Sequence, residues 1–114
     1  MARVIGGSTI GEGCFLDRDV VIGYPSDDEL PLLDGDREAE IAGATVGDDC
    51  TLRAGTLYSR ARLGSGVRSG HGWLVREDST VGDGCLIGTG VTIDNDCRVG
   101  DHCSLQTGVY IPNG

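Results

Sequence analysis

Residues 81–104 read VGDGCL-IGTGVT-IDNDCR-VGDHCS, which divides into four units of six residues. Every unit begins with Val or Ile and has Cys or Val in its fifth position, and three of the four have Gly in the second position. Self-similarity at a fixed short period is typical of repeat architectures. We therefore expect the chain to stack many copies of one small structural unit.

The row of aliphatic first positions extends from this stretch toward both ends of the chain. Its members on the same grid of six are Leu63, Val75, Val81, Ile87, Ile93, Val99, Leu105 and Ile111, and only Ser69 departs from it. Earlier the spacing is looser, with a five-residue step into Leu63 and with Val4, Ile10, Leu16, Ile22, Val46, Leu52 and Tyr58 as members. The repeat thus covers nearly all of residues 1–114.

The composition indicates how such a unit would fold. The 114 residues include 20 Gly, more than double ordinary usage, but only five aromatic residues and three Pro. Gly tolerates a sharp corner, and six residues suffice for one short strand and one corner. Three such sides close a triangular coil of about 18 residues, and coils stacked about 4.8 Å apart pair in a parallel ladder. The prediction is an all-β, single-domain parallel β-helix of about six coils.

The five cysteines all occupy the fifth, inward position of their units. They are Cys14, Cys50, Cys85, Cys97 and Cys103. Free Cys behaves as a small hydrophobic residue, so we expect these side chains to pack in the core rather than to form disulfides. The spacing of the cysteines fits no zinc motif, and no metal site is predicted.

The repeat is interrupted at about residues 24–40, which we expect to form a loop that protrudes from the coil. This segment holds seven acidic residues and one Arg, together with Leu30, Leu32 and Leu33. Two interpretations stay open. The leucines either pack back onto their own coil, or the loop reaches a neighbouring subunit and walls a substrate cleft.

The charge excludes some function classes. The chain has 18 acidic residues against nine basic ones, all of them Arg, for a formal net charge of −9. A nucleic-acid partner is disfavoured because phosphate contacts need a basic surface. The sequence has neither a signal segment nor a membrane-spanning segment, so we expect a cytoplasmic protein without a membrane partner. The dense carboxylate surface further suggests a halophilic, high-salt setting.

One segment, residues 51–76, has no acidic residue and five arginines. They are Arg53, Arg60, Arg62, Arg68 and Arg76. Arg binds phosphate through two parallel hydrogen bonds, so this set is a candidate for binding an anionic ligand. The alternative is that these arginines pair with acids of other coils or subunits.

Within that segment, the unit at residues 69–74 departs from both inward positions of the repeat. Ser69 replaces the aliphatic residue and Trp73 replaces the small one, which suggests that the two exchange volume in the core. His71 lies in a corner position between two glycines and should point outward. A neutral imidazole there would be able to accept a proton from an attacking amine or hydroxyl. The other histidine, His102, is interpreted as a surface residue.

Units 81–86 and 99–104 resemble the hexapeptide-repeat, left-handed parallel β-helix family of acyltransferases. The run from Gly70 to Glu77 is similar to the Gly-His-x-x-x-aliphatic-Arg-Glu stretch of members that act on amino sugars, often nucleotide-linked ones. Those members commonly have Asn at the position of Gly72 and a small aliphatic residue at that of Trp73.

The resemblance implies an acetyltransferase that uses acetyl-CoA and transfers the acetyl group directly to an amino sugar or sugar nucleotide. It also implies that His71 is the general base, and that a homotrimer forms with active sites between adjacent helices. The candidate residues for binding substrate or CoA are Arg53, Arg60, Arg62, Arg68, Arg76, Gly70, Gly72 and Trp73.

A second hypothesis is a non-catalytic β-helical module for oligomerisation or binding, or a truncated fragment of a larger transferase. The sequence ends at Gly114, partway through a unit, without the further coils or the helix that family members usually carry. Acetyl-CoA binding by this chain would distinguish the two hypotheses.

Overall fold

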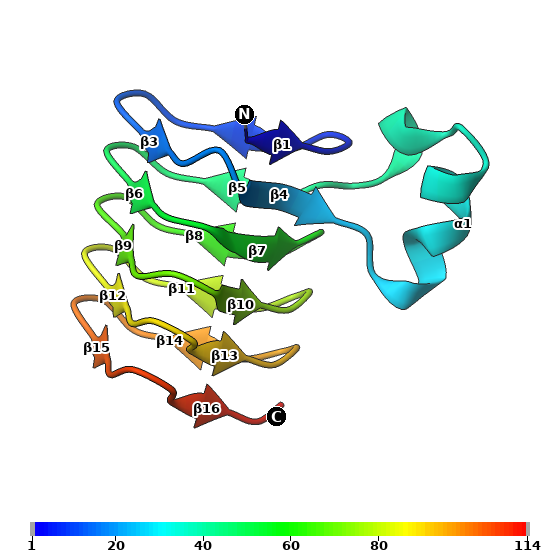
Figure 1. The fold of residues 1–114 in the computed structure, drawn as a ribbon. Coiled ribbons are helices and arrows are strands. Elements are labelled where there is room, and N and C mark those ends of the chain that lie inside the picture. The colour runs from blue at the N-terminus through cyan, green and yellow to red at the C-terminus, as the bar shows by residue number, and fades with distance from the viewer. Residues whose placement is uncertain (1, 114) are drawn as a thin grey trace.

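The computed structural model describes residues 2–113, which form three parallel sheets around one core (Figure 1). The first sheet consists of β1 (Arg3–Val4), β4 (Val20–Tyr24), β7 (Gly55–Tyr58), β10 (Trp73–Val75), β13 (Thr92–Ile93) and β16 (Tyr110–Ile111). The second consists of β2 (Thr9–Ile10), β5 (Thr45–Val46), β8 (Arg62–Leu63), β11 (Thr80–Val81) and β14 (Arg98–Val99). The third consists of β3 (Phe15–Leu16), β6 (Thr51–Leu52), β9 (Arg68–Ser69), β12 (Leu86–Ile87) and β15 (Ser104–Leu105).

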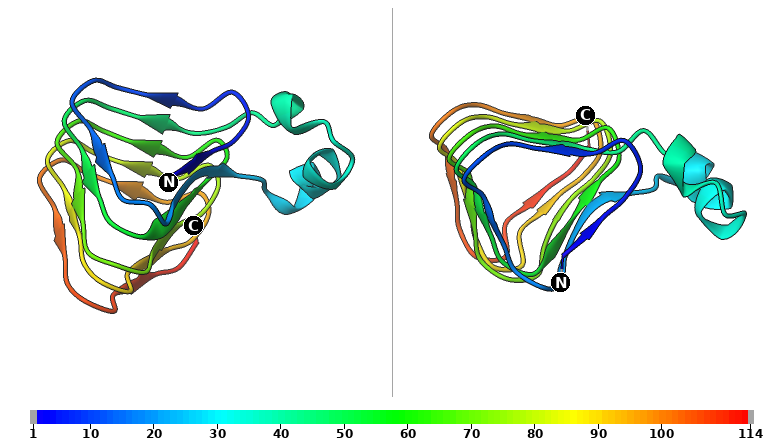
Figure 2. Two further views of the ribbon diagram at one scale, coloured as in Figure 1. Left: turned by 45° about the horizontal axis from the view of Figure 1, so that its top comes forward. Right: turned by 90° about the horizontal axis from the view of Figure 1, so that it is seen from above.

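The chain visits the three sheets in turn, so each strand pairs with the strand one coil further on. Seen from above in Figure 2, the path is triangular and runs anticlockwise as it recedes from the N-terminus, which makes the coil left-handed. Val75 pairs with Ile93, 18 residues later, as predicted. Thr45 pairs with Arg62, only 17 residues later, which confirms the five-residue step into Leu63. The predicted left-handed parallel β-helix is therefore confirmed.

The inward positions of the repeat form the core, as the period predicts. The first-position residues Val75, Ile87 and Ile93 have no exposed surface. All five cysteines are free, and the thiols of Cys14, Cys50, Cys85 and Cys97 donate to backbone carbonyls. The Cys50 thiol donates to the Gly64 oxygen of the next coil over 3.1 Å. Burial raises the pKa of the Cys50 thiol to about 11, so this cysteine stays a neutral thiol at physiological pH.

A ladder of side chains runs along the corner between the second and third sheets. The backbone N–H of Ser65 donates to Asp83 Oδ1 over 2.8 Å, and the N–H of Asp83 donates to Asp101 Oδ1 over 2.8 Å. A Cβ added at Gly82 would lie 2.3 Å from Asp101 Oδ1, and one at Gly64 would lie 2.3 Å from Asp83 Oδ1. Glycine therefore recurs in the second position partly because the carboxylate of the next coil occupies that space.

The interruption of the repeat forms a loop that projects from the coil between β4 and β5 (Figures 1 and 2). It contains helix α1 (Leu30–Asp34), flanked by the 3₁₀ helices Asp27–Glu29 and Glu38–Glu40. Leu32 and Leu33 are half-buried and Leu30 is exposed, so some apolar surface of this loop stays open. Neither α1 nor the 3₁₀ helices of residues 2–113 could span a membrane.

Candidate functional site

His71 lies in the turn from β9 to β10, at the corner between the third and first sheets. Its backbone is held on both sides, because its carbonyl accepts from the Gly90 N–H over 2.8 Å and its N–H donates to Thr89 Oγ1 over 3.3 Å. The side chain is exposed, and no residue among 2–113 hydrogen-bonds to the imidazole. The corner therefore fixes the backbone of His71 and leaves both ring nitrogens open to a ligand.

A strip of glycines runs beside His71 along the axis of the coil. Gly72, Gly90 and Gly108 stack in successive coils with φ of 69°, 70° and 77°. A Cβ added at any of the three would meet nothing within 4 Å. We call these three residues the glycine strip. It exposes bare backbone over three coils, which lets an extended ligand lie close to His71.

Trp73 is part of the core at this corner, and its side chain is 1% exposed. The indole occupies the space above Gly55, its partner in the neighbouring coil, and donates from Nε1 to the Arg53 carbonyl over 2.7 Å. Ser69 is also buried, and its hydroxyl accepts from the Arg53 N–H over 2.9 Å. The volume of Trp73 is thus accommodated by Gly55 as well as by the small Ser69, and the buried indole presents no surface to a ligand.

Two of the five candidate arginines lie near His71. Arg53 is one coil away, since the Gly72 N–H donates to the Ala54 carbonyl directly after it. Its Nη1 donates to the Ser69 carbonyl over 2.9 Å. Arg68 is exposed on β9, three residues before His71.

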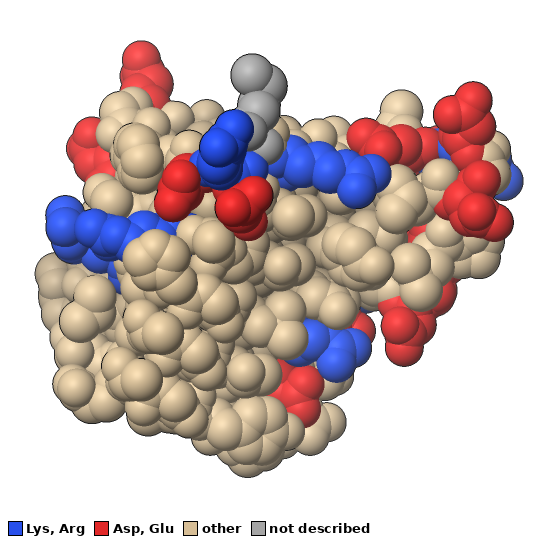
Figure 3. Space-filling model, viewed as in Figure 1, with Lys and Arg blue, Asp and Glu red and all other residues tan. Residues whose placement is uncertain are grey.

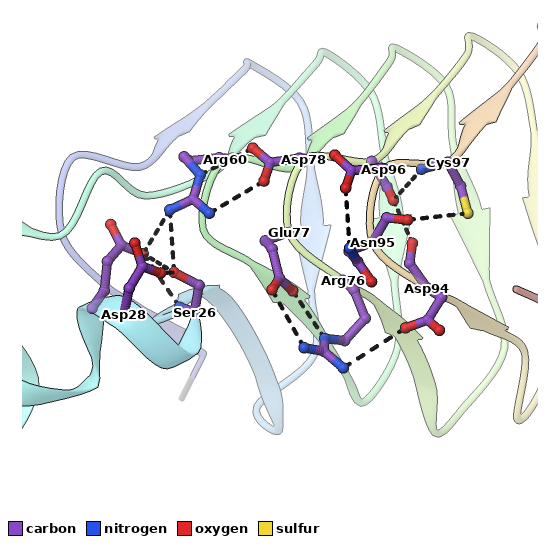
Figure 4. A network of polar contacts seen from close by, with 12 residues as sticks. Ser26, Asp28, Arg60, Arg76, Glu77, Asp78, Asp94, Asn95, Asp96 and Cys97 are labelled. Atoms are coloured by element: carbon purple, nitrogen blue, oxygen red, sulfur yellow. Dashed lines mark hydrogen bonds and ion pairs between the residues drawn. The ribbon is translucent and has the colours of Figure 1, made fainter. Parts of the chain in front are cut away.

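Two other arginines lie at the corner between the first and second sheets, where carboxylates surround them (Figure 4). Arg60 pairs with Asp78 at 3.0 Å and with Glu29 at 3.4 Å. Arg76 lies over the Tyr58 ring at 4.9 Å, and pairs with Glu77 at 2.9 Å and with Asp94 at 3.7 Å. Arg60 and Arg76 each pair with one acid of the next coil, Asp78 and Asp94, as the alternative interpretation predicts, and Arg76 also pairs with its neighbour Glu77.

The fifth arginine, Arg62, lines a hollow of about 260 Å³ on the outer face of the second sheet, with Thr45, Ser65 and Thr80. This sheet is the side of the triangle opposite the corner that carries His71 (Figure 2). The structure therefore divides the five arginines among three parts of the surface, and they form no single patch.

The surface around the lower coils of the first and third sheets is largely uncharged (Figure 3). Its outward residues include Leu74 and Thr92 on the first sheet and Leu86 and Ser104 on the third. Leu86 is 43% exposed. In a chain with a net charge of −9, this face favours an uncharged ligand segment or a protein surface over a polyanion. Residues 2–113 contain no group of His, Cys, Asp and Glu side chains arranged to hold a metal ion.

Two protein-family models match the chain, one on each side of His71. Residues 76–113 match the bacterial transferase hexapeptide (six repeats), and residues 35–57 match the hexapeptide repeat of succinyl-transferase. A comparison with curated proteins gave no match. The match over residues 76–113 contains strands β11 to β16, which follow the corner of His71. The match over residues 35–57 contains β5, β6 and most of β7, which precede it.

Proposed function

We propose that this chain, which belongs to the hexapeptide-repeat transferase family, is an acetyl-CoA-dependent acetyltransferase of an amino sugar or a sugar nucleotide. The family supports acyl transfer in general. The choice of acetyl group and acceptor rests on the run from Gly70 to Glu77. The structural observation behind the proposal is the exposed imidazole of His71, on a fixed backbone beside the glycine strip.

In the proposed reaction His71 acts as general base and transfer is direct. The amine or hydroxyl of the acceptor attacks the thioester carbonyl carbon, and the neutral imidazole takes the proton that this group loses. The C–S bond then breaks, and the imidazolium returns the proton to the departing CoA thiolate. The backbone N–H of Thr89 has no acceptor among residues 2–113, which makes it a candidate donor to the oxyanion.

The residues around His71 support binding of a long, thin substrate. We assign the glycine strip, which includes Gly72, to the pantetheine arm of acetyl-CoA. Its bare backbone over three coils offers an extended and uncharged surface to that arm. Gly70 allows the close approach of Thr89, since a Cβ there would lie 2.4 Å from its Oγ1. Arg53 and Arg68 supply positive charge nearby, whereas we assign Trp73 to the core.

One chain provides only one wall of this site. His71 is exposed and the hollow on the second sheet does not extend to it. We therefore propose a homotrimer in which a neighbouring chain covers the corner of His71 and excludes water from the reaction. The uncharged face around the lower coils suits such a contact (Figure 3).

Substitution of His71 by Ala tests the proposal. Thiol release from acetyl-CoA is measured with a panel of nucleotide-linked amino sugars, and acetyl-CoA binding is measured by calorimetry. We expect kcat to fall by about 10²-fold or more, with acetyl-CoA affinity within about twofold of the unsubstituted chain. His102→Ala is the matched control, because His102 is the other exposed histidine and lies at a different corner.

Retention of more than about half of the turnover by His71→Ala would refute the role of His71. Failure of the unsubstituted chain to bind acetyl-CoA or to turn over any acceptor would refute the enzymatic proposal. The chain would then be a non-catalytic module for oligomerisation or binding.

A further inference from the structure

The hollow on the second sheet lies at the centre of a row of outward residues. The strand register places Thr45 beside Arg62, Arg62 beside Thr80, and Thr80 beside Arg98. Parallel strands lie about 4.8 Å apart, so the two arginines flank Thr80 from neighbouring strands on either side of it. Their side chains leave the sheet on the same face. Arg62 and Thr80 line the hollow, and Arg98 lies beside Thr80 on the next strand, at the edge of the hollow.

Both arginines lack a carboxylate partner. Arg60 and Arg76 are each paired with two acids, but Arg62 and Arg98 form no ion pair with any of residues 2–113. Both are exposed. The hydroxyls of Thr45 and Thr80 also have no hydrogen-bond partner in this part of the chain, so they are available as donors. The row thus combines two free cations with two free hydroxyl donors.

One acid, Asp83, also lines the hollow, but its carboxylate already takes part in the ladder of side chains along the corner between the second and third sheets. Its Oδ1 accepts the backbone N–H of Ser65 over 2.8 Å, above Gly64. Hydrogen bonding to a backbone N–H fixes this oxygen at the edge of the hollow. The glycines at residues 47, 64 and 82 also line the hollow and add no side chain of their own to it.

We propose that this hollow binds a diphosphate group, held by Arg62 and Arg98 from two sides and by the Thr80 hydroxyl between them. Each guanidinium can bind phosphate oxygens through two parallel hydrogen bonds, and a diphosphate offers oxygens to both at once. The diphosphate belongs either to coenzyme A or to a nucleotide-linked sugar that reacts at the His71 of a neighbouring chain, because this sheet lies opposite the corner of the chain's own His71. That assignment to a substrate rests on the proposed function, whereas the selection of a diphosphate rests on the row alone.

Calorimetric titration of the full chain with inorganic pyrophosphate tests the site. It is done at the lowest salt concentration at which the chain stays folded, because salt screens such contacts. We expect Arg62→Ala and Arg98→Ala each to weaken binding by about tenfold or more. Arg62→Gln and Arg98→Gln repeat the test with side chains that keep more of the length. Arg18→Ala is the matched control, since Arg18 is an exposed arginine without an ion pair in residues 2–113 and should change binding by less than about twofold.

Absence of pyrophosphate binding, or an equal loss in Arg18→Ala, would overturn the proposal. Competition by 3′-dephospho-CoA would assign the site to the acyl donor, and competition by UDP would assign it to the acceptor. Competition by neither would overturn the assignment to an organic diphosphate. The His71→Ala variant should bind pyrophosphate normally. Arginine-dependent binding in a chain without acetyl transfer would therefore refute the proposed function and leave the diphosphate site intact.

Discussion

The glycines of this chain have at least two separate roles, and they differ from one position of the repeat to the next. Gly84 has a φ of 68°, in the left-handed region where residues with a Cβ are strained. Gly82 has no such backbone, but the carboxylate of Asp101 lies where its side chain would be. Gly84 thus allows the backbone to turn at the corner, and Gly82 leaves room for the Asp101 carboxylate, which belongs to the ladder of side chains along that corner.

Substitution of Gly82 and Gly100 by Ala separates these effects. Both residues occupy the second position of a unit, but a Cβ at Gly82 would lie 2.7 Å from the Asp101 backbone N, whereas one at Gly100 would meet nothing within 4 Å. We expect Gly82→Ala to lower the free energy of unfolding by about 1–3 kcal/mol, because it displaces Asp101 and its hydrogen bond. Gly100→Ala should change it by less than about 0.5 kcal/mol. Urea unfolding measures both, and equal losses would contradict this role of the ladder.

The period of six predicts which side chains point inward, but contacts between coils follow a period of about 18. Trp73 was expected to exchange volume with Ser69 in its own unit, yet Gly55, 18 residues earlier, also makes room for it. The candidate arginines were grouped because they are close in the sequence, so Arg98 was missed. It lies 36 residues after Arg62, two coils along the same face. Comparing residues 18 apart would have identified both.

At the scale of elements, a single buried carboxylate closes the protruding loop. Glu29 accepts the N–H of Ser26 over 3.2 Å at the start of the loop and that of Ala42 over 3.0 Å at its end. The Ser59 hydroxyl and the Arg60 guanidinium reach the same carboxylate from the next coil. Burial tends to raise the pKa of Glu29, but these hydrogen bonds outweigh it and hold the pKa below its usual 4.5. Glu29 thus joins both ends of the loop to the body of the coil.

Replacement of Glu29 by Gln should release the loop. Because the pKa is lower in the folded chain, the contribution of Glu29 is present above about pH 4.5 and is lost as the pH falls through the folded-state value. We expect Glu29→Gln to lower the free energy of unfolding by about 1–3 kcal/mol at neutral pH, and to remove part of its decline in acid. Hydrogen exchange of the Ala42 amide should accelerate in the variant. The control, Glu40→Gln, loses only an exposed pair with Arg37 and should leave that amide protected.

The existence of this loop was predictable, but its attachment was not. The break in the repeat predicts a protrusion, since the positions on the grid of six between Ile22 and Val46 hold acidic instead of aliphatic residues: Asp28, Asp34 and Glu40. The sequence distinguishes Glu29 from the other acids of the loop only by a Ser-x-x-Glu capping box that begins at Ser26. Its role depends on the fold, which brings Ser26, Ala42 and Ser59 together.

At the scale of the whole molecule, charge is distributed unevenly over a rigid triangular stack. Acidic residues gather on the protruding loop and near the N-terminal end of the stack, and the face around the coils toward the C-terminus is largely uncharged (Figure 3). The net charge predicts the excess of acid but not this division, because the repeat phase decides which face each residue occupies. The arrangement separates a solvated acidic region from a face suited to another protein chain.

The net negative charge of the chain should make its thermal stability depend on the salt concentration. With a net charge of −9, the acids repel one another, and raising KCl from about 0.1 to about 1 M shortens the screening length from about 10 to about 3 Å. We expect the melting temperature to rise over this range. Asp34 and Asp36 are exposed in the loop, and Asp36 has a φ of 64°, which Asn also tolerates. The double variant Asp34→Asn, Asp36→Asn should melt higher in low salt and respond less to KCl. An unchanged response to KCl in the double variant would contradict charge repulsion as the cause.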